Sequence, residues 1–539
     1  MSPPQKPAGR AQPRSVRRHP LPIRIAHWVN AACVVILLMS GLAILNGWPA
    51  LYWGVRTHFN HPLLALYATT NASGQRIGVT DIDGRTFTTT GWLGLSAGKG
   101  GTQVQRGFPS WATLPGRLDL ALARRWHFFF AWIFVLNGLA YAVYALLSRH
   151  LRRDLLPSRR ELRHLGASVR DHLLLRFRHD DAAAPYNVLQ KLAYLGVIFG
   201  LGPLAVATGL SMSPWMDAAF PWLLDIFGGR QSARTIHFIT AFALLFFLLI
   251  HLAMVLLSGP INRTRAMITG RYRVSNAGRD ARPDSGTRLE RRHMLVRIAT
   301  GVGALALGGW DSPNGRGWWT RLLDREAAVT EAVQRAITPP GATGRQYTKA
   351  DISSHFKSNG THNPRNPAYQ ALAQKNFADW RLTVDGLVER ELSLSLAEIK
   401  AMPSVTQITR HDCVEGWSCI GEWTGVPLAH ILAKAGVRKE ARYVMFFCYD
   451  TLPGANEAYY ESIDLAEAAH PETILAYGMN GNGLPIPHGA PLRLRLGRQL
   501  GYKMPKYLRR IELVASFETI RGGHGGFYED NGYAWYAGI

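Results

Sequence analysis

The sequence predicts two bodies of different fold class: an all-α bundle of four transmembrane helices with a further span behind it, and then an α+β domain. In the first half of the chain, four apolar segments each reach about the 20 residues that cross a bilayer. From about residue 349, short β-branched runs separated by glycine and proline take their place. A content of 47% apolar and 18% charged residues fits a chain of 539 residues that lies partly in lipid.

The apolar segments predict four spans, at 26–46, 126–147, 189–211 and 235–257. Residues 1–24 are rich in proline and arginine, so we expect a disordered basic arm before a membrane domain at 25–258. The residues between the first two spans are polar and rich in glycine and threonine, which predicts an extramembrane loop.

The net charge of +24 points to either nucleic acid or an anionic membrane surface. Arginines crowd the segment 148–181, between the second and third spans, and the segment after the fourth span. Positively charged loops stay in the cytoplasm. The distribution therefore favours a multi-pass membrane protein, with the lipid bilayer rather than nucleic acid as its partner.

Four histidines occupy complementary depths of the predicted bundle. His237 and His251 lie within roughly 40° of one face of the fourth span, about 21 Å apart along its axis. His127 opens the second span on the outer side, and His27 opens the first span on the inner side. The pairs His27 with His251 and His127 with His237 predict two bis-imidazole haem b sites, because an ionisable residue inside a membrane is by default functional.

His58 and His61 compete for the outer haem site, and we rank them second because they lie beyond the aromatic border that ends at Trp53. The block 19–28, together with the histidines of the fourth span, resembles the four-helix cytochrome b of hydrogenase and formate dehydrogenase membrane subunits. This resemblance covers residues 17–260 and implies two haems b and exchange of electrons with quinone or quinol. Arg124 and Arg125 would then neutralise haem propionates or contact lipid phosphates.

After the fourth span, residues 259–290 predict a cytoplasmic linker. Arg291 and Arg292 then precede a short apolar run, and this segment, 291–310, resembles a twin-arginine export signal that would anchor the chain and carry its second half to the periplasm. A surface helix is the alternative, because Arg297 interrupts the run. Residues 311–348 predict a tether with an amphipathic helix.

Residues 349–539 predict the α+β domain, with short helices between its strands. The predicted strands are 381–388, 405–410, 443–448, 492–496 and 509–514. Cys413 stands where the second of these runs gives way to a polar turn, and a soft thiolate is an appropriate ligand for molybdenum. The other cysteines, Cys33, Cys419 and Cys448, lack the spacing of a zinc ribbon, a haem c attachment or a disulfide framework.

The run Cys413-Val-Glu415-Gly-Trp417-Ser resembles the segment that supplies the molybdenum-ligating cysteine in the sulfite oxidase-like molybdopterin fold, in the form found in periplasmic methionine sulfoxide reductase catalytic subunits. The resemblance implies a molybdenum-molybdopterin cofactor held by Cys413.

Further cofactor residues are predicted downstream of this run. Arginine binds phosphate by bidentate hydrogen bonds and lysine by its point charge. The cofactor-binding residues that the resemblance implies are Asn359, Cys413, Cys448, His488, Arg493, Lys503 and Lys506. In it, Asn359 corresponds to an asparagine close to the metal, and Cys448 replaces a threonine near the cofactor.

Glu415 decides the predicted direction of the reaction, because a carboxylate near the metal would repel sulfite. We therefore expect a membrane-bound molybdoenzyme that reduces a small S-oxide or N-oxide at a periplasmic site, with Cys413 and Glu415 as its catalytic residues and with electrons that come from quinol through the haems. The alternatives are a sulfite-type dehydrogenase that passes electrons to quinone, a non-catalytic electron-transfer subunit, and a haem-free receptor or anchor.

Overall fold

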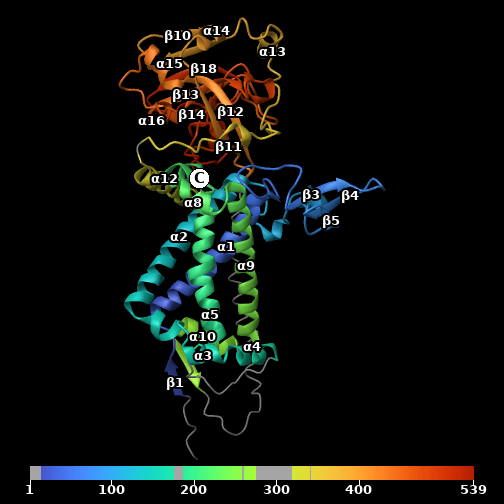
Figure 1. Ribbon diagram of the computed structural model, residues 1–539, viewed down its shortest axis with the longest axis vertical. Coiled ribbons are helices and arrows are strands. Elements are labelled where there is room, and N and C mark those ends of the chain that lie inside the picture. Colours follow the sequence, from blue (N-terminus) through green and yellow to red (C-terminus); the bar gives the residue numbers. More distant parts are fainter. Residues whose placement is uncertain (1–13, 175–185, 258–259, 275–317, 340, 539) are drawn as a thin grey trace, which may run out of the picture. The chain divides into compact units, whose positions relative to one another are not determined.

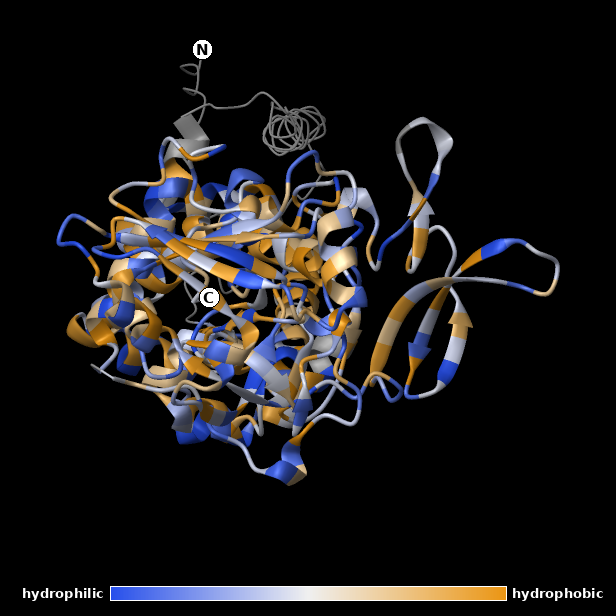
Figure 2. Ribbon diagram, turned by 90° about the horizontal axis from the view of Figure 1, so that it is seen from above, coloured by the Kyte–Doolittle hydropathy of each residue, from blue (hydrophilic) through white to orange (hydrophobic). Residues whose placement is uncertain are grey.

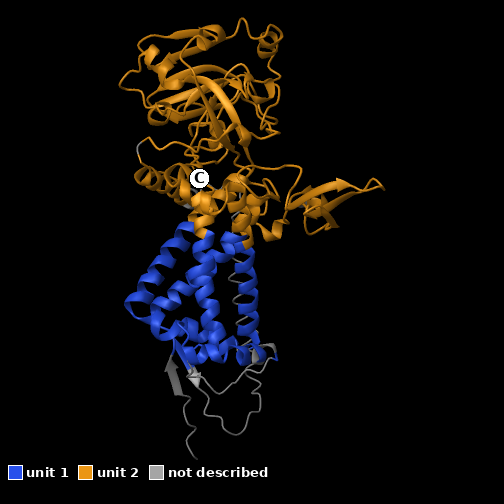
Figure 3. Ribbon diagram, in the orientation of Figure 1, with its two compact units in different colours: residues 1–38, 130–205, 240–315 blue, residues 39–129, 206–239, 316–539 orange. Residues whose placement is uncertain are grey.

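The computed structural model describes residues 14–174, 186–257, 260–274, 318–339 and 341–538. The chain divides into two compact units, one of Met1–Leu38, Phe130–Ala205 and Thr240–Gly315 and the other of Met39–Phe129, Val206–Ile239 and Arg316–Ile539 (Figure 3). The predicted anchor at 291–310 lies outside the described residues.

Four helical segments are long and apolar enough to cross a membrane, which confirms the predicted transmembrane bundle (Figure 1). They are α1 (Leu21–Leu45), α2 (Leu120–Leu147), the run of α5 (Val188–Gly196), η4 (Val197–Leu201) and α6 (Gly202–Ser211), and α9 (Arg230–Leu257).

The helices α2 and α9 begin before the predicted spans do. At the start of α2, the Asp119 carboxylate accepts a hydrogen bond from the Leu122 N–H at 2.9 Å and so satisfies one of the open donors of the first turn. At the start of α9, Arg230 and Gln231 are buried in protein. Hydropathy detects only the apolar part of a helix, so these polar first turns were missed.

Part of the arm that was expected to be disordered is folded. The strand β1 (Arg14–Arg17) pairs antiparallel with β8 (Arg271–Val274), and Arg18 lies over the Tyr272 ring at 5.1 Å. Cation–π contact and strand pairing outweigh the polar composition here. The same unit contains α3 (Arg159–Arg163), α4 (Leu165–Leu173) and, where a linker was predicted, α10 (Pro260–Thr269).

The predicted loop between the first two spans contains a small antiparallel sheet. Its strands are β2 (Ala50–Leu51), β3 (Leu64–Thr70), β4 (Arg76–Ile82) and β5 (Arg85–Thr88), with a separate pair of β6 (Leu95–Ala97) and β7 (Gln103–Gln105). Asp83 and Gly84 turn the chain between β4 and β5 with positive φ angles, as an Asp-Gly hairpin does. Figure 2 shows hydrophobic and hydrophilic residues mixed along these strands.

The C-terminal domain is an α+β domain, as predicted, and it is built on two sheets. One sheet has the order β10-β9-β18-β13-β14, and the other has β11-β12-β15-β16 with β17 also paired to β15. The strands are β9 (Arg381–Gly386), β10 (Leu392–Ser395), β11 (Val405–Asp412), β12 (Ser418–Pro427), β13 (Tyr443–Cys448), β14 (Tyr460–Asp464), β15 (Ile474–Met479), β16 (Asn482–Gly483), β17 (Arg493–Arg495) and β18 (Leu508–Val514).

Helices cover these sheets and connect them to the rest of their unit. They are α7 (Pro214–Ala219), α8 (Pro221–Ile226), α12 (Trp318–Ile337), α13 (Pro367–Gln374), α14 (Leu396–Lys400), α15 (Leu428–Ala435), α16 (Leu465–Ala468) and α17 (Phe527–Asp530). In α15, the buried residues Leu428, Ile431, Leu432 and Ala435 follow the helical period and pack into the main core. The turn between β11 and β12, where Cys413 lies, packs in a separate hydrophobic cluster with Trp417 and Cys419.

Candidate functional site

Cys413 lies in the turn between β11 and β12. Its N–H donates to the Trp417 carbonyl oxygen at 3.0 Å, and the Gly416 N–H donates to the Cys413 carbonyl oxygen at 3.0 Å. Gly416 has a φ of 117°, so this tight turn requires glycine there. Cys413 is 4% exposed, at the strand end where the sequence placed it.

Glu415 sets the charge beside the Cys413 thiol. Its Oε2 accepts a hydrogen bond of 2.8 Å from the Trp417 indole N–H and lies 3.9 Å from the Cys413 Sγ. Burial raises the pKa of the Cys413 thiol well above its ordinary value, and Glu415 raises it further. A thiolate at this position therefore needs a cation in contact with it, which a bound metal would supply.

A cradle of aromatic and cationic side chains surrounds the Phe356 ring. The rings of His411, Trp423 and His488 have centroids 5.8, 5.4 and 5.5 Å from it. Buried atoms of this cradle that have no hydrogen-bond partner in the described part of the chain are Trp423 Nε1, His411 Nε2, Arg493 Nε and Arg495 Nε. Buried polar atoms without partners are costly, so the cradle fits a polar ring system such as a pterin.

Buried cations in the same cradle fit a phosphate. Arg493 and Arg495 are almost fully buried and lie over the Trp423 ring at 5.1 and 4.3 Å. Burial lowers the pKa of Lys506 to about 7 and the pKa of Arg493 to about 10, because water no longer stabilises their charges. An anion among these side chains would stabilise their charged forms and offset the cost of burial.

Lys503 is already neutralised by protein carboxylates. Its Nζ lies 2.6 Å from Glu461 Oε1 and 2.7 Å from Glu529 Oε1, and all three residues are buried. We therefore no longer propose Lys503 as a phosphate ligand. Spacing along the chain could not reveal this, because both glutamates come from distant segments.

The other predicted cofactor residues, Asn359, Cys448 and His488, lie in three different environments. Asn359 contributes its carbonyl oxygen, which accepts a hydrogen bond of 2.7 Å from Lys506. Cys448 ends β13 inside the main core, and burial raises the pKa of its thiol. Burial lowers the pKa of His488 to about 4, and Arg493 adds to this shift. His488 is therefore neutral and can act as a hydrogen-bond donor or acceptor at the rim of the cradle.

Sequence reasoning missed Arg495, His411 and Trp423. The alternation in β17, Arg493-Leu-Arg495, is typical of a strand with one face in solvent, yet all three residues are buried. Arg495 donates to His411 Nδ1 at 2.8 Å, and a Cβ on Gly501 would lie 2.5 Å from His411 Cε1. The one available signal was the concentration of cationic residues between 493 and 506.

His127 on α2 and His237 on α9 face each other within one unit. Their ring centroids are 6.2 Å apart, with an angle of 65° between the ring planes. The Ser40 hydroxyl lies 3.0 Å from His127 Nδ1, and the Thr208 hydroxyl lies 3.0 Å from His237 Nδ1. Each hydroxyl orients its ring, as the hydrogen-bond partners of metal-bound histidines do.

His27 on α1 and His251 on α9 form a second pair, in the other unit. Their ring centroids are 6.3 Å apart, with an interplanar angle of 55°. An iron ion that binds two imidazoles at about 2 Å each would hold their ring centres about 6 Å apart, so both pairs fit a bis-histidine haem. The structure thus brings together the histidines that the sequence paired.

The competing histidines, His58 and His61, line a different cavity with Trp53, Leu63 and Asp83. Burial lowers the pKa of His58, and Arg56 and His61 add to this shift. In the described part of the chain, no group of three or more histidine, cysteine or acidic residues is arranged to hold a metal ion by itself.

The first turn of α9 holds the Cys413 turn directly. Arg230 donates to the Gly416 carbonyl oxygen at 3.3 Å and to the Ser418 hydroxyl at 2.9 Å. Gln231 donates to the same two oxygens, at 3.0 Å each. The helix that carries His237 is therefore hydrogen-bonded to the turn that carries Cys413.

A chain of buried charges extends this contact. Arg230 lies 3.7 Å from the Asp412 carboxylate, and Arg410 lies 2.8 Å from Asp412 and 3.0 Å from Asp217 of α7. Arg410 and Arg230 hold the pKa of Asp412 well below its ordinary value, although burial opposes them. We refer to Asp217, Arg410, Asp412 and Arg230 as the buried ion chain.

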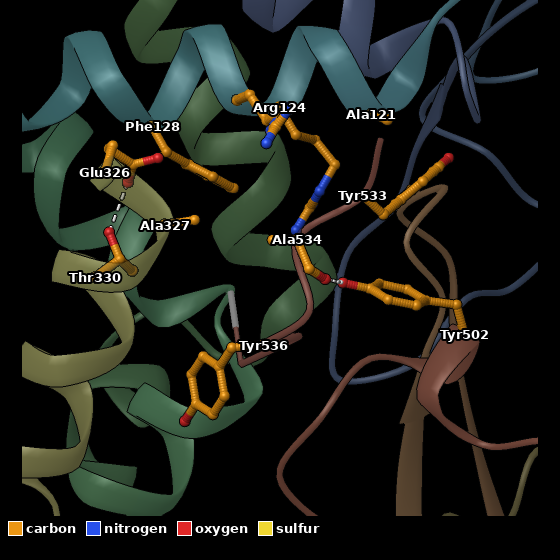
Figure 4. Close-up of a pocket in the computed structure, with 11 residues that line it drawn as sticks. Ala121, Arg124, Phe128, Glu326, Ala327, Thr330, Tyr502, Tyr533, Ala534 and Tyr536 are labelled. Carbon is orange, nitrogen blue, oxygen red and sulfur yellow. Dashed lines mark hydrogen bonds between the residues drawn. The ribbon is translucent and has the colours of Figure 1, made fainter. Parts of the chain in front are cut away.

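Arg124 and Arg125, at the start of α2, line a cavity shared with α12 and the C-terminal segment (Figure 4). The Arg124 guanidinium lies over the Phe128 ring at 5.0 Å and reaches toward Ala534. Arg125 forms an ion pair with Asp324 of α12. Arg125 thus has a protein carboxylate as its partner, where the sequence suggested a haem propionate or a lipid phosphate.

Known families account for both halves of this arrangement. Residues 18–270 match the prokaryotic cytochrome b561 family, and residues 369–519 match the oxidoreductase molybdopterin binding domain. The protein is therefore an integral membrane oxidoreductase that fuses a cytochrome b561-type domain, which binds haem b, to a molybdopterin-binding domain.

Two curated relatives narrow the family. The chain is 35% identical over 279 residues to the protein-methionine-sulfoxide reductase subunit YedZ1 of Azospira oryzae, with 51% of this chain and 98% of that protein covered. It is 37% identical over 206 residues to the protein-methionine-sulfoxide reductase catalytic subunit MsrP of Xanthomonas axonopodis, with 35% of this chain and 63% of that protein covered. The chain belongs to the family of the YedZ1 subunit.

Among solved structures, the sulfane dehydrogenase SoxCD of Paracoccus pantotrophus is 25% identical to this chain. The match covers 26% of this chain and 39% of the SoxCD chain, and its TM-score is 0.24. A likeness at that score carries no argument about this chain.

Proposed function

We propose that this protein takes electrons from quinol, passes them through two haems b and uses them at its molybdopterin site to reduce an S-oxide or an N-oxide. The observation that carries the proposal is the hydrogen bonding between the first turn of α9, two helical turns before His237, and the Cys413 turn. Electrons can then move within one chain, so a soluble carrier is not required.

Cys413 would hold the molybdenum, which supplies oxygen-atom transfer chemistry when bound. The pterin and its phosphate would lie in the cradle, held by Arg493, Arg495, Lys506 and the polar edges of His411 and Trp423. The pairs His127–His237 and His27–His251 would hold the two haems.

Glu415 favours a neutral substrate. Its carboxylate lies 3.9 Å from the Cys413 Sγ and is held there by the Trp417 indole N–H. A fixed negative charge at that distance repels a dianion such as sulfite, while a neutral S-oxide escapes this repulsion. The names of both curated relatives, which describe methionine-sulfoxide reductase subunits, agree with this choice.

We place the protein in the bacterial inner membrane with its molybdopterin domain on the periplasmic side. Four apolar helices and arginine-rich segments between and after them support this orientation. Accessibility of single introduced cysteines to a membrane-impermeant reagent in intact cells would test it.

The function is tested by following the haem spectrum of the reduced protein in membranes. We expect dimethyl sulfoxide to oxidise the haems and sulfite to leave them unchanged. Cys413→Ser should reduce turnover by at least about a hundredfold, because it removes the soft thiolate that would bind the metal, and should leave the haem spectrum intact. Cys419→Ser, at a buried thiol in β12, is the matched control.

Two results would contradict the proposal. Reduction of the oxidised haems by sulfite, without oxidation of reduced haems by any S-oxide or N-oxide, would establish the reverse reaction. Full turnover in Cys413→Ser would remove Cys413 from the site.

A further inference from the structure

The cavity between α2, α12 and the C-terminal segment has the size and polarity of a water site. Its volume is about 30 Å³, room for about two water molecules. Two atoms of its lining residues, the Tyr536 hydroxyl and the Arg125 Nε, are buried and have no hydrogen-bond partner in the described part of the chain. Water in the cavity would give the Arg125 Nε a partner, whereas the Tyr536 hydroxyl points away from Glu326 in Figure 4.

Glu326 brings a carboxyl group to this cavity from α12. It is 9% exposed, and its Oε1 accepts a hydrogen bond of 2.6 Å from the Thr330 hydroxyl, as Figure 4 shows. Burial raises the pKa of Glu326, although Thr330 and the Arg125 guanidinium oppose this shift. The pKa of Glu326 is thus shifted toward the pH range in which a carboxyl group can both release and take up a proton.

The opposite wall of the cavity reaches the Cys413 turn. Tyr502 and Tyr533 line the cavity, and both pack in the hydrophobic cluster that contains Cys413 and Trp417. The Tyr502 hydroxyl donates to the Ala534 carbonyl oxygen at 2.8 Å. The cavity therefore has Glu326 on one wall and, on the other, two tyrosines that pack beside the proposed molybdenum ligand.

We propose that this cavity delivers protons to the molybdopterin site and that Glu326 is the group that transfers them. The inference rests on the proposed function, because reduction of an S-oxide consumes two protons as well as two electrons. The S–O bond breaks, the sulfur is reduced to a thioether, and the oxygen leaves as water. The haems supply the electrons, and water at the outer surface supplies the protons through the cavity.

The charges that face Glu326 come from α2 and α12. Arg125 is held by Asp324, and Arg124 lies over Phe128. The hydroxyl groups of Tyr533 and Tyr536 point away from Glu326 in Figure 4. The Arg125 guanidinium stabilises the anion that Glu326 becomes when it releases a proton, so burial does not prevent that release.

The test follows oxidation of the reduced full-length protein by dimethyl sulfoxide in lipid nanodiscs, in H₂O and in D₂O. We expect Glu326→Gln to slow haem oxidation by at least tenfold and to abolish the solvent isotope effect, while Glu326→Asp recovers part of both. Glu331→Gln, at a half-buried glutamate of α12 that pairs with Arg335 at 2.9 Å and does not line the cavity, should behave as the wild type. Haem and molybdenum contents confirm that each variant is assembled.

An infrared difference spectrum between the oxidised and reduced protein gives a readout that does not depend on turnover. The wild type should show a carboxyl C=O band that shifts in D₂O and disappears in Glu326→Gln. The proposal is overturned if the band persists in that variant, or if the variant keeps the wild-type rate and isotope effect. If no S-oxide or N-oxide oxidises the wild-type haems, the proposed function fails, and the infrared band still decides whether Glu326 carries a proton.

Discussion

Burial decides the protonation of the histidines in the molybdopterin domain. The pKa of His488 falls to about 4, and the pKa of His411 falls well below its ordinary value, in both cases chiefly because burial disfavours the charged ring and neighbouring arginines add to this. Burial, with Arg498 adding, likewise lowers the pKa of His470 to about 4. Neutral rings can accept hydrogen bonds, which the buried arginines and backbone N–H groups around them require.

His470 gives a pH dependence that can be measured away from the cofactor. Its Nδ1 accepts a hydrogen bond of 3.3 Å from the Glu472 N–H. The unfolded chain binds a proton at this residue below about pH 6.5, whereas the folded chain binds it only near pH 4, so stability is complete above that range and is lost as the pH falls. We expect a loss of about 2 kcal/mol between pH 6.5 and pH 4 from this residue.

The measurement is thermal unfolding of the full chain at a series of pH values. His470→Gln should flatten the dependence between pH 6.5 and pH 4, and His430→Gln, at an exposed residue of α15, should leave it unchanged. An equal slope in the wild type and in His470→Gln would show that another group is responsible.

At the scale of elements, two helices each contact a proposed haem ligand with a hydroxyl residue followed by glycine. Ser40-Gly41 in α1 and Thr208-Gly209 in α6 each present a hydroxyl to the Nδ1 of an imidazole. A Cβ on either glycine would lie 3.4 Å from the Cε1 of that ring. The glycine lets the helix approach the ring, and the adjacent hydroxyl binds it. Glycine inside a helix lowers helix stability by about 1 kcal/mol relative to alanine, so its use here favours positioning of the imidazole ring over helix stability.

These hydroxyls should tune the haem that we propose His127 and His237 bind. A ring that donates its Nδ1–H is a more basic ligand and stabilises the oxidised iron. We therefore expect Ser40→Ala or Thr208→Val to raise the potential of one haem, on the order of tens of millivolts, and to leave the other unchanged. A potentiometric titration of the haem spectrum measures this. Ser211→Ala, in the same α6, is the control, because its hydroxyl binds a backbone carbonyl at 2.9 Å. Equal shifts of both haems would contradict the assignment.

At the scale of the whole molecule, the ends of the membrane helices that belong to the second unit share one interior with the molybdopterin domain. The buried ion chain runs from α7 through the end of β11 to α9, and its four members are at most 7% exposed. A buried charge that loses its partner is strongly destabilising. The contact between the domain and these helices is therefore buried in the same way as a protein core, and breaking it should be strongly destabilising.

The buried ion chain can be broken at Asp217. Asp217→Ala leaves Arg410 with one carboxylate instead of two and should lower the free energy of unfolding by about 3 kcal/mol. Asp225→Ala, which removes the exposed ion pair with Arg345, should cost less than about 1 kcal/mol. Thermal unfolding in nanodiscs measures both. Equal losses in the two variants would show that the chain contributes no more than a surface pair.

The sequence by itself determined the four spans, the pairing of the histidines and the position of Cys413 at a strand end. Each of these depends on local chemistry: apolar length sets a span, helical spacing sets the depth of His237 and His251, and a change of pattern marks the end of β11. These features do not require knowledge of distant partners.

Only the tertiary structure decided which charged groups are available and which are already paired. Lys503 and Arg495 look equivalent in the sequence, yet Lys503 lies between two glutamates and Arg495 lies in the cradle over Trp423. Arg125 and the first turn of α9 likewise take partners from segments far along the chain. The charge of a buried side chain is set by the groups that fold around it, so chemistry at the Cys413 turn depends on contacts that sequence spacing does not encode.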